Sequence, residues 1–278
     1  MSDYKAFGRM ESESWSDSSR ALRYVELFAS APEKAIQPLL DAVEARQGQR
    51  ALDLCCGHGS VSKALHSRAC GVWGLDFSSA MLDIARKGVP GAVFVEGDAQ
   101  RLPFPDKDFD IVVSNFGICH VPDQPSALAE AHRVLRTGGR FAMTVWCGPD
   151  ASPCFEVLYG AVKKHGSAEV SVPSGPDFHQ FAKSQVAQDL LSRAGFSDVR
   201  LNIADCFFDL DKPERLCEIF ENATVRAANL LAAQPPDRLL EIRSAVAAMV
   251  RNRFSIGGRW RVPMPATLVS ARKTAKDL

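Results

Sequence analysis

The stretch that decides the fold is ALDLCCGHGSVSKAL, residues 51–65. An apolar strand runs into a turn at Gly57-His58-Gly59, and the turn leads into a helix. Glycine suits such a turn because it tolerates positive φ and lets a ligand approach the backbone. A strand, turn and helix in this order direct backbone N–H groups and the positive end of a helix dipole toward one edge of a sheet. We therefore expect a ligand-binding turn at Gly57 and Gly59.

Apolar runs of strand length recur on both sides of this unit and alternate with amphipathic helical stretches. The expected strands are 50–55, 71–75, 92–95, 109–114 and 140–146, and the helices among them are 61–68, 79–87 and 124–136. Continuous apolar strands separated by helices are typical of a parallel sheet covered on both faces. The pattern predicts an α/β fold with a doubly wound, mostly parallel, Rossmann-like sheet.

The rest of the chain follows a different pattern. We expect an N-terminal helical segment at 1–48, the sheet core at 49–150, cap insertions with a sixth strand at 151–258, and a last strand and tail at 259–278. Residues 1–19 are polar and Ser-rich, and helices are expected at 21–30 and 32–45. The segments 151–181 and 212–258 follow strand ends, so they are expected to cover the carboxyl edge of the sheet, where ligands of such folds bind.

Composition excludes several classes of protein. The chain is 46% hydrophobic and 24% charged, which is inconsistent with a wholly disordered chain. Lys plus Arg (33) balance Asp plus Glu (33), so no overall field favours nucleic acid or an anionic membrane. The eight cysteines show no CxxC spacing and no HExxH occurs, so no metal site is predicted. No apolar run approaches 18 residues and no leader pattern is present, so we expect a cytoplasmic protein without a membrane partner.

Two nucleotide-binding readings of the glycine turn fail at one residue. A phosphate loop GxxxxGK[ST] needs glycine at 62 and Ser or Thr at 64, but the chain has Ser62-Lys63-Ala64. A dinucleotide GxGxxG starting at Gly57 also needs glycine at 62. Ser62 therefore disfavours an ATP-type phosphate loop and a nicotinamide-dependent oxidoreductase.

Carboxylates at the ends of the next strands favour a third interpretation of the glycine turn, as part of a site for a nucleoside. Asp76 ends the second expected strand, where a carboxylate can accept both hydroxyls of a ribose. Asp98 follows the third strand, where it could accept from the exocyclic amine of an adenine. Asp53 lies four residues before Gly57, and Asn115 ends the fourth strand. The spacing supplies turn, ribose and base sites in that order.

Residues 50–146 resemble the core of the class I S-adenosylmethionine-dependent methyltransferases, in the small-molecule group that includes the ubiquinone and menaquinone C-methyltransferases. LDLCCGHG resembles the first motif of that family, usually LDxGCGTG, and GLDFSSAMLDIAR resembles the second. The run from GDAQRLPF to LRTGGRF resembles the third to fifth motifs. Cys55 stands where the family usually has glycine, and His58 where it usually has threonine. The resemblance covers about a third of the chain and leaves the acceptor open.

The resemblance implies that S-adenosyl-L-methionine is the cofactor. Gly57 and Gly59 would border its methionine part, Asp53 would help to hold its amino group, and Asn115 would lie close by. Tyr24 belongs to a segment that resembles the WxxxAxxY-type N-terminal stretch of the family, which often folds over the cofactor. Trp15 belongs to the same segment, and ordinary packing is the alternative for both aromatic residues.

The resemblance also implies residues for the nucleoside. Asp76 would bind the ribose hydroxyls, Phe77 and Met81 would pack on the adenine, and Asp98 with the backbone of Ala99 would read the adenine edge. Structural alternatives stay open for four of them. Asp76 could cap the next helix, Asp98 could be a turn residue, Met81 could be a core residue, and Phe77 could cover the sheet end.

His120 is the candidate catalytic residue, because it follows the fourth strand by five positions at the expected ligand edge. It could act as a general base or orient the acceptor. As a base with an unperturbed imidazole it would titrate near 6.5. His165 and His179 belong to the expected cap, and we interpret them as surface or structural residues, with contact to the acceptor as the alternative.

The sequence thus predicts methyl transfer to a small, apolar or aromatic metabolite. The alternative is an S-adenosylmethionine-binding protein without transferase activity, which a missing acceptor pocket would favour. Nucleic-acid methylation is disfavoured, because Asn115 is followed by Phe116-Gly117 and no NPPY-type tetrapeptide occurs. The acceptor, the methylated element and the oligomeric state stay open.

Overall fold

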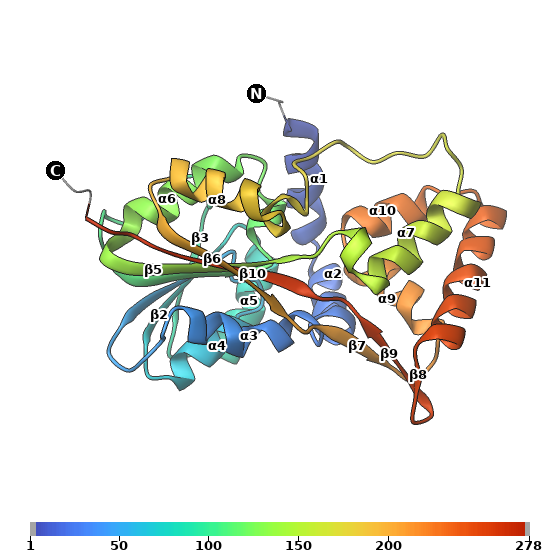
Figure 1. Ribbon diagram of the computed structural model, residues 1–278, viewed down its shortest axis with the longest axis horizontal. Coiled ribbons are helices and arrows are strands. Elements are labelled where there is room, and N and C mark those ends of the chain that lie inside the picture. Colours follow the sequence, from blue (N-terminus) through green and yellow to red (C-terminus); the bar gives the residue numbers. More distant parts are fainter. Residues whose placement is uncertain (1–3, 276–278) are drawn as a thin grey trace.

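A seven-stranded sheet forms the centre of the structure, a computed structural model that describes residues 4–275. The strands lie in the order β3-β2-β1-β4-β5-β10-β6 (Figure 1). Their bounds are β1 Arg50–Leu54, β2 Gly71–Asp76, β3 Val93–Glu96, β4 Phe109–Asn115, β5 Leu135–Trp146, β6 Ser197–Ala204 and β10 Ala266–Arg272. Strands β1 to β5 pair in parallel, and β10 is antiparallel to β5 and β6. The doubly wound, mostly parallel sheet is confirmed.

Helices cover both faces of this sheet, which explains why its inner strands are apolar throughout. Helices α3 (Ile36–Ala42) and α4 (Ser60–Ser67) pack on one face, and α6 (Gln124–Val134) and α8 (Ser184–Arg193) on the other (Figure 1). Helix α5 (Ser79–Gly88) connects β2 to β3. The order reverses between β1 and β4, and a crevice at such a reversal is where sheets of this kind bind ligands.

A second layer of helices and a small sheet lie at one end of the large sheet (Figure 1). The helices are α7 Pro153–His165, α9 Arg215–Ala223, α10 Arg226–Ala232 and α11 Pro236–Arg253. The small sheet has the order β7-β9-β8, with bounds β7 Phe207–Leu210, β8 Ser255–Ile256 and β9 Arg259–Pro263. Short helical turns are η3 Ile118–His120, η4 Pro149–Ala151 and η5 Gln180–Ala182.

The single last strand expected at the C-terminus is wrong, because the structure divides it. Strand β9 belongs to the small sheet and β10 to the large one. Pro263 and Pro265 lie at the division, where they lack the N–H groups that a continuous ladder needs. Arg261 on β9 forms an ion pair with Asp209 on β7, with Nε and Oδ1 2.7 Å apart, so it links two neighbouring strands of the small sheet.

The N-terminal segment contains a helix that the sequence analysis did not predict. Helix α1 (Lys5–Trp15) stands between the large sheet and the cap (Figure 1), and Phe7, Glu11 and Trp15 form its buried side at a spacing of four residues. Helix α2 (Ser18–Arg23), a π-helical turn η1 (Tyr24–Phe28) and a 3-10 turn η2 (Pro32–Ala35) follow. Phe28 meets the rings of Trp146, Phe208 and Phe220, so this segment joins the sheet to the cap.

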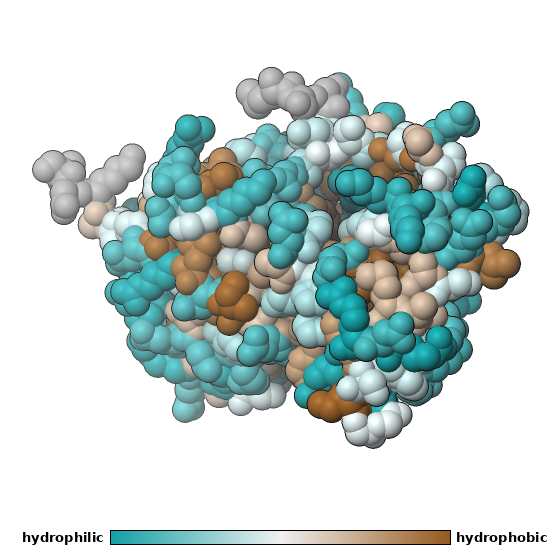
Figure 2. Space-filling model, turned by 45° about the vertical axis from the view of Figure 1, so that its right-hand side comes forward, coloured by the Kyte–Doolittle hydropathy of each residue, from teal (hydrophilic) through white to brown (hydrophobic). Residues whose placement is uncertain are grey.

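The outer surface is largely hydrophilic on the face shown in Figure 2, with small, separated apolar patches. Such scattered apolar side chains are normal for globular proteins. Among the described residues, no helix is long and apolar enough to cross a membrane.

Candidate active site

A cavity of about 490 Å³ opens at the carboxyl ends of β1, β2, β4 and β5, at the reversal of strand order. Asp53, Asp76 and Asn115 line it from the strands, and Tyr24 lines it from η1. An adjoining cavity of about 300 Å³ includes Asp98 and Ala99 and shares five residues with the first: Cys55, Asp76, Phe77, His120 and Val121. Together they offer the volume that a nucleoside cofactor and a small second ligand require.

The turn after β1 is shaped by positive backbone angles. Gly57 has φ +53° and lines the cavity, and its N–H donates to Asp76 Oδ2 at 2.8 Å. Gly59 has φ +84° and is the N-cap residue of α4, and a Cβ there would lie 3.0 Å from that of Ala85. Gly59 does not line either cavity, so its place beside the methionine part of a cofactor stays a prediction. Cys55 has φ +58°, which lies in the left-handed region that favours glycine. The family that the sequence resembles usually has glycine at this position.

Asp53 is 1% exposed and accepts a hydrogen bond from Ser62 Oγ at 2.7 Å. Ser62 is thus the partner of this carboxylate rather than part of a phosphate loop. Burial raises the pKa of Asp53 to about 7, against the opposing hydrogen bonds from Ser62 and with a smaller raising effect of Asp76.

Asp76 is also buried, and its pKa is raised by burial although the N–H groups of Ser78 and Gly57 donate to it. It does not cap α5, because Ser78 Oγ accepts from the N–H of Met81 in that role. It lies on the cavity wall at the end of β2, and its contact with a ribose stays a prediction.

The predicted adenine residues gather around the boundary of the two cavities. Phe77 is 36% exposed over the sheet end and lines both cavities, and Met81 lines the larger one while it packs in a cluster with Trp15. Asp98 accepts from the backbone N–H of Gln100 at 2.8 Å, so it has the turn role as well. Ala99 is buried in the wall of the smaller cavity.

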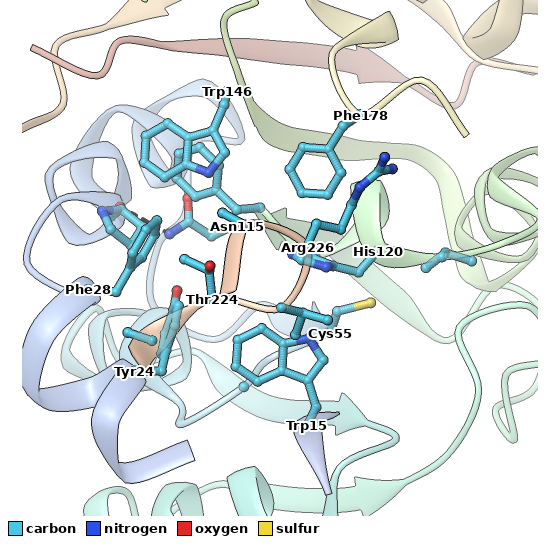
Figure 3. A pocket seen from close by; sticks show the side chains of 18 of the residues that line it. Trp15, Tyr24, Phe28, Cys55, Asn115, His120, Trp146, Phe178, Thr224 and Arg226 are labelled. Atoms are coloured by element: carbon cyan, nitrogen blue, oxygen red, sulfur yellow. Dashed lines mark hydrogen bonds between the residues drawn. The ribbon is translucent and has the colours of Figure 1, made fainter. Parts of the chain in front are cut away.

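Asn115 and Tyr24 lie on the wall of the larger cavity (Figure 3). The Asn115 amide donates to Pro32 O at 3.1 Å and accepts from Thr144 Oγ1 at 2.6 Å, which fixes its orientation. Tyr24 stacks on Phe28 and meets Trp15 edge to face, with ring centroids 5.4 Å apart in both pairs. Burial raises the pKa of Tyr24, so its hydroxyl stays protonated.

His120 lies between the two cavities and is paired with a buried carboxylate. Its Nδ1 is 2.8 Å from Glu11 Oε2, and the indole N–H of Trp15 donates to the same oxygen at 3.0 Å. Burial alone would lower the pKa of His120, but the Glu11 carboxylate and, to a smaller extent, Cys119 outweigh it and hold the pKa well above 6.5. A base at His120 would therefore titrate well above the value predicted from an unperturbed imidazole.

His179 has the opposite character, although the sequence analysis treated it as structural. Its Nδ1 is 3.0 Å from the carbonyl oxygen of Trp146, and it lines the larger cavity. A carbonyl can only accept, so Nδ1 carries the proton and Nε2 keeps a lone pair in the neutral ring. Burial lowers the pKa of His179, Arg226 and Lys183 lower it further, and the Trp146 carbonyl and Asp177 oppose them. His179 is neutral at pH 7 and can accept a proton.

The far side of the larger cavity is aromatic. Phe116 stacks on Trp146 with centroids 3.8 Å apart, and Phe155, Tyr159, Phe178 and Phe220 come from the two cap segments. Figure 3 shows Trp146 and Phe178 across the cavity from Trp15. The segments 151–181 and 212–258 both contribute to the wall, but the lining residues of the second end at Leu230.

Comparison with known proteins assigns the fold and site to a family. A family model described as "Methyltransferase domain" matches residues 52–143. The demethylmenaquinone methyltransferase of Beutenbergia cavernae is 42% identical over 121 residues, which are 44% of this chain and half of that enzyme. The demethylmenaquinone methyltransferase of Staphylococcus epidermidis is 33% identical over 178 residues, 58% of this chain and 73% of that enzyme. The chain belongs to the S-adenosylmethionine-dependent methyltransferases.

Solved structures agree with this methyltransferase fold. The YcgJ protein of Bacillus subtilis aligns with a TM-score of 0.58 at 20% identity, over 87% of this chain and 98% of that one. Phosphoethanolamine N-methyltransferase 2 of Haemonchus contortus, in complex with S-adenosyl-L-methionine, aligns with a TM-score of 0.51 at 18% identity, over 86% of this chain and 52% of that one.

The residues of this methyltransferase fit its cofactor, S-adenosylmethionine. Asp53 and Asp76 present buried carboxylates to the larger cavity, and a cationic amino group and ribose hydroxyls are the donors that such acceptors require. Glu11 Oε1 is buried with no hydrogen-bond partner among the described residues, and Glu11 lines the smaller cavity. A donor such as the exocyclic amine of adenine would satisfy it.

Sequence reasoning missed two residues of the cavity walls, Glu11 and Arg226, and it favoured a structural role for His179. Arg226 lines the larger cavity from α10. Phe7, Glu11 and Trp15 are spaced four residues apart, which is typical of one face of a helix, but the polar and Ser-rich residues around them made this pattern hard to recognise. His179 and Arg226 had no local signal, because only the folding of the cap brings them to the cavity.

Proposed function

We propose that this methyltransferase transfers a methyl group from S-adenosylmethionine to a small, apolar or aromatic metabolite. One observation carries the proposal: the cavity joins a carboxylate-lined end at β1 and β2 to an aromatic end under the cap. An S-adenosylmethionine-binding protein without transferase activity needs no such second compartment. The relatives named demethylmenaquinone methyltransferases support a small-molecule acceptor.

Asp53 is proposed to hold the amino group of the cofactor and Asp76 its ribose hydroxyls. Gly57 and Asn115 border the methionine part, and Tyr24 closes over it from η1. Phe77, Met81, Asp98 and Ala99 enclose the adenine. This assignment is supported by the position of each residue in the two adjoining cavities; Gly59 acts through the shape of the turn.

When bound, the cofactor supplies a sulfonium-linked methyl group that already contains its leaving group. The chain must therefore align the acceptor and exclude water, which can contribute about 7 to 11 kcal/mol to lowering the barrier. The aromatic side chains of the cap do both. His120, held as an imidazolium by Glu11, orients the acceptor through its Nε2–H, and the neutral His179 accepts a proton where the acceptor must lose one.

A small-molecule acceptor and a cytoplasmic site of action are part of the same proposal. All eight cysteines are free thiols, which is typical of a reducing compartment. The balanced charge of the chain argues against a polyanionic partner.

The test is an assay with methyl-labelled S-adenosylmethionine and a deproteinised metabolite extract. We expect label in a small-molecule fraction, and we expect Asp76→Ala to weaken cofactor binding by at least about tenfold, because each hydrogen bond to an ionised acceptor contributes about 1.5 to 3 kcal/mol. Asp83→Ala, on the exposed side of α5, is the matched control. Cofactor binding without label transfer in any fraction would favour the binding-protein alternative.

A further inference from the structure

We propose that the acceptor carries an acidic group, a carboxylate or a phosphate, that is bound by Arg226 in the wall of the larger cavity. The inference rests on the proposed function, since it concerns the second ligand of the same site. It adds the charge and chemical class of the acceptor.

Arg226 is the first residue of α10, and it is part-buried. Figure 3 shows its side chain extending beside Phe178, above His120. Its guanidinium carbon is 5.9 Å from the ring centroid of Phe7, which is fully buried. The charge therefore lies among aromatic groups at the cavity rather than in open solvent.

The other arginines of the cap helices are neutralised. Helices α9, α10 and α11 carry six arginines, and five of them pair with glutamates: Arg215 with Glu218, Arg238 with Glu241, Arg243 with Glu221, Arg251 with Glu214 and Arg253 with Glu156. The guanidinium of Arg226 has no carboxylate oxygen within 4.0 Å and donates no hydrogen bond to another residue in the described part of the chain. The one cap arginine at the cavity is the one without a counter-ion.

The acids on the cavity wall do not supply that counter-ion. Asp53 and Asp76 lie at the cofactor end and accept from Ser62 and Gly57. Asp177 lines the larger cavity from the cap segment 151–181. Its carboxylate is already paired, because Lys183 Nζ is 2.7 Å from it and the backbone N–H of His179 donates to it. A guanidinium beside this cavity is thus available to a ligand.

The charge of Arg226 affects the pKa values of two neighbouring residues. It lowers the pKa of His179 and opposes the rise that burial causes in the pKa of Tyr159. Both residues line the larger cavity, so the charge acts on its interior. Tyr159 stays protonated because burial raises its pKa, and its hydroxyl can donate to the same anion.

This chemistry selects an aryl acid. The guanidinium fork matches the two oxygens of a carboxylate or phosphate, and its bonds to them strengthen away from water. Phe178 lies beside Arg226 (Figure 3), and Phe155 lines the same cavity. A neutral aromatic acceptor would leave the part-buried cation without compensation, and a cationic one would be repelled.

Calorimetry with three naphthalene probes, of which the carboxylate and the amide have nearly the same shape, tests the charge requirement. We use 2-naphthoate, 2-naphthyl phosphate and 2-naphthamide on protein saturated with S-adenosylhomocysteine. We expect at least one of the acids to bind at least tenfold more tightly than the amide. Whichever acid binds more tightly indicates whether the acceptor carries a carboxylate or a phosphate. Arg226→Gln should bring the acids to within about threefold of the amide, and Arg226→Lys should retain part of the preference. Arg238→Gln, an exposed arginine on α11, should change nothing.

Equal binding of acids and amide, no binding of either acid, or an equal loss for all probes in Arg226→Gln would overturn the inference. The last result would mean that Arg226 only packs on Phe7. A thermal melt of each variant identifies a folding defect. If Arg226→Gln does not fold, the selectivity of folded Arg226→Lys for the acids over the amide decides between recognition of an acid and packing on Phe7.

A second arm separates this inference from the proposed function. Label transferred from methyl-labelled S-adenosylmethionine to an extract is separated by anion exchange at neutral pH. Label retained as an anion, and lost with Arg226→Gln, supports the inference. Label in a neutral product other than the methyl ester of an acid overturns it and leaves the methyltransferase activity intact. A labelled methyl ester comes from an acidic acceptor, and it supports the inference when it is lost with Arg226→Gln. No label in any product, despite cofactor binding, overturns the proposed function.

Discussion

Asp53 combines deep burial with a position on the wall where a cationic amino group is expected. Its Oδ2 accepts from Ser62, and its pKa is raised to about 7 by burial. The folded protein therefore holds a proton on Asp53 over a pH range in which an exposed aspartate is ionised. A cationic ligand favours the ionised form, so binding must release that proton.

We predict that the affinity for S-adenosylmethionine rises as the pH increases from 5.5 to 7.5, by up to about tenfold per pH unit below the pKa of Asp53. Calorimetry in buffers with different ionisation enthalpies should detect proton release near pH 6.5. Asp53→Asn should bind more weakly at pH 7.5 and lose most of this dependence. Release of the same number of protons by wild-type protein and Asp53→Asn would remove Asp53 from the amino-group site.

The pair of Glu11 and His120 shows how one contact determines the charge of a candidate catalytic residue. We predict that the pKa of His120 lies well above 6.5, so that the imidazole is protonated at that pH, because the Glu11 carboxylate outweighs the effect of burial. Glu11→Gln removes that charge, so burial should then lower the pKa of His120 below 6.5. Titration of the imidazole nitrogens by NMR measures both values.

Glu13→Gln is the matched control for this titration, because Glu13 is exposed on the same helix. It should leave the pKa of His120 unchanged. A wild-type His120 that titrates near 6.5 would contradict the assignment and restore its role as a neutral base.

At the scale of elements, α1 forms part of the wall of the site between the large sheet and the cap. Gly8 approaches Pro122 closely, and Gly175 approaches the ring of Phe7, so α1 contacts both the loop after β4 and the segment before α8. Residues from α1, η1, α7, α9 and α10 therefore enclose the cavity together. None of the residues that line it comes from α11.

We predict that cofactor product and acceptor slow hydrogen exchange in peptides from 5–28, 153–179 and 215–232. These elements enclose the cavity, and ligands stabilise the closed form of such covers. Peptides from 238–253 of α11 should change little and serve as an internal control. Equal exchange with and without ligands in the first three regions would show that they do not act as a cover.

At the scale of the whole molecule, the proposed cofactor site lies where the sheet, the N-terminal segment and the cap meet. Phe28 links all three through Trp146, Phe208 and Phe220. A ligand that binds only when these parts are assembled stabilises the folded state by mass action.

We predict that S-adenosylhomocysteine at one hundred times its dissociation constant stabilises the protein by about 2.7 kcal/mol, which should raise the melting temperature by roughly 5 to 10 °C. NAD and ATP should give no shift, because Ser62 interrupts both of their glycine motifs and is paired with Asp53. Differential scanning fluorimetry measures this. A shift with NAD equal to that with S-adenosylhomocysteine would contradict the family's cofactor assignment for this chain.

The sequence by itself determined the sheet and the cofactor edge. Continuous apolar strands alternating with helices permit few topologies, and the carboxyl ends of parallel strands meet at one edge. Asp53, Gly57, Asp76 and Asp98 each stand at or near such an end, so their convergence followed from their spacing alone. The glycine turn, and the interruption of the two nucleotide-binding motifs at Ser62, could also be predicted from local spacing alone.

Only the tertiary structure decided the acceptor side. Glu11 meets His120 across 109 positions of sequence, and this contact changes the charge of the imidazole. Arg226 and His179 reach the cavity because the cap folds over it, and the division of β9 from β10 depends on which sheet offers a partner. Local periodicity reports which side of an element is buried, but the partner it meets and the electrostatic field there depend on the packing of distant segments.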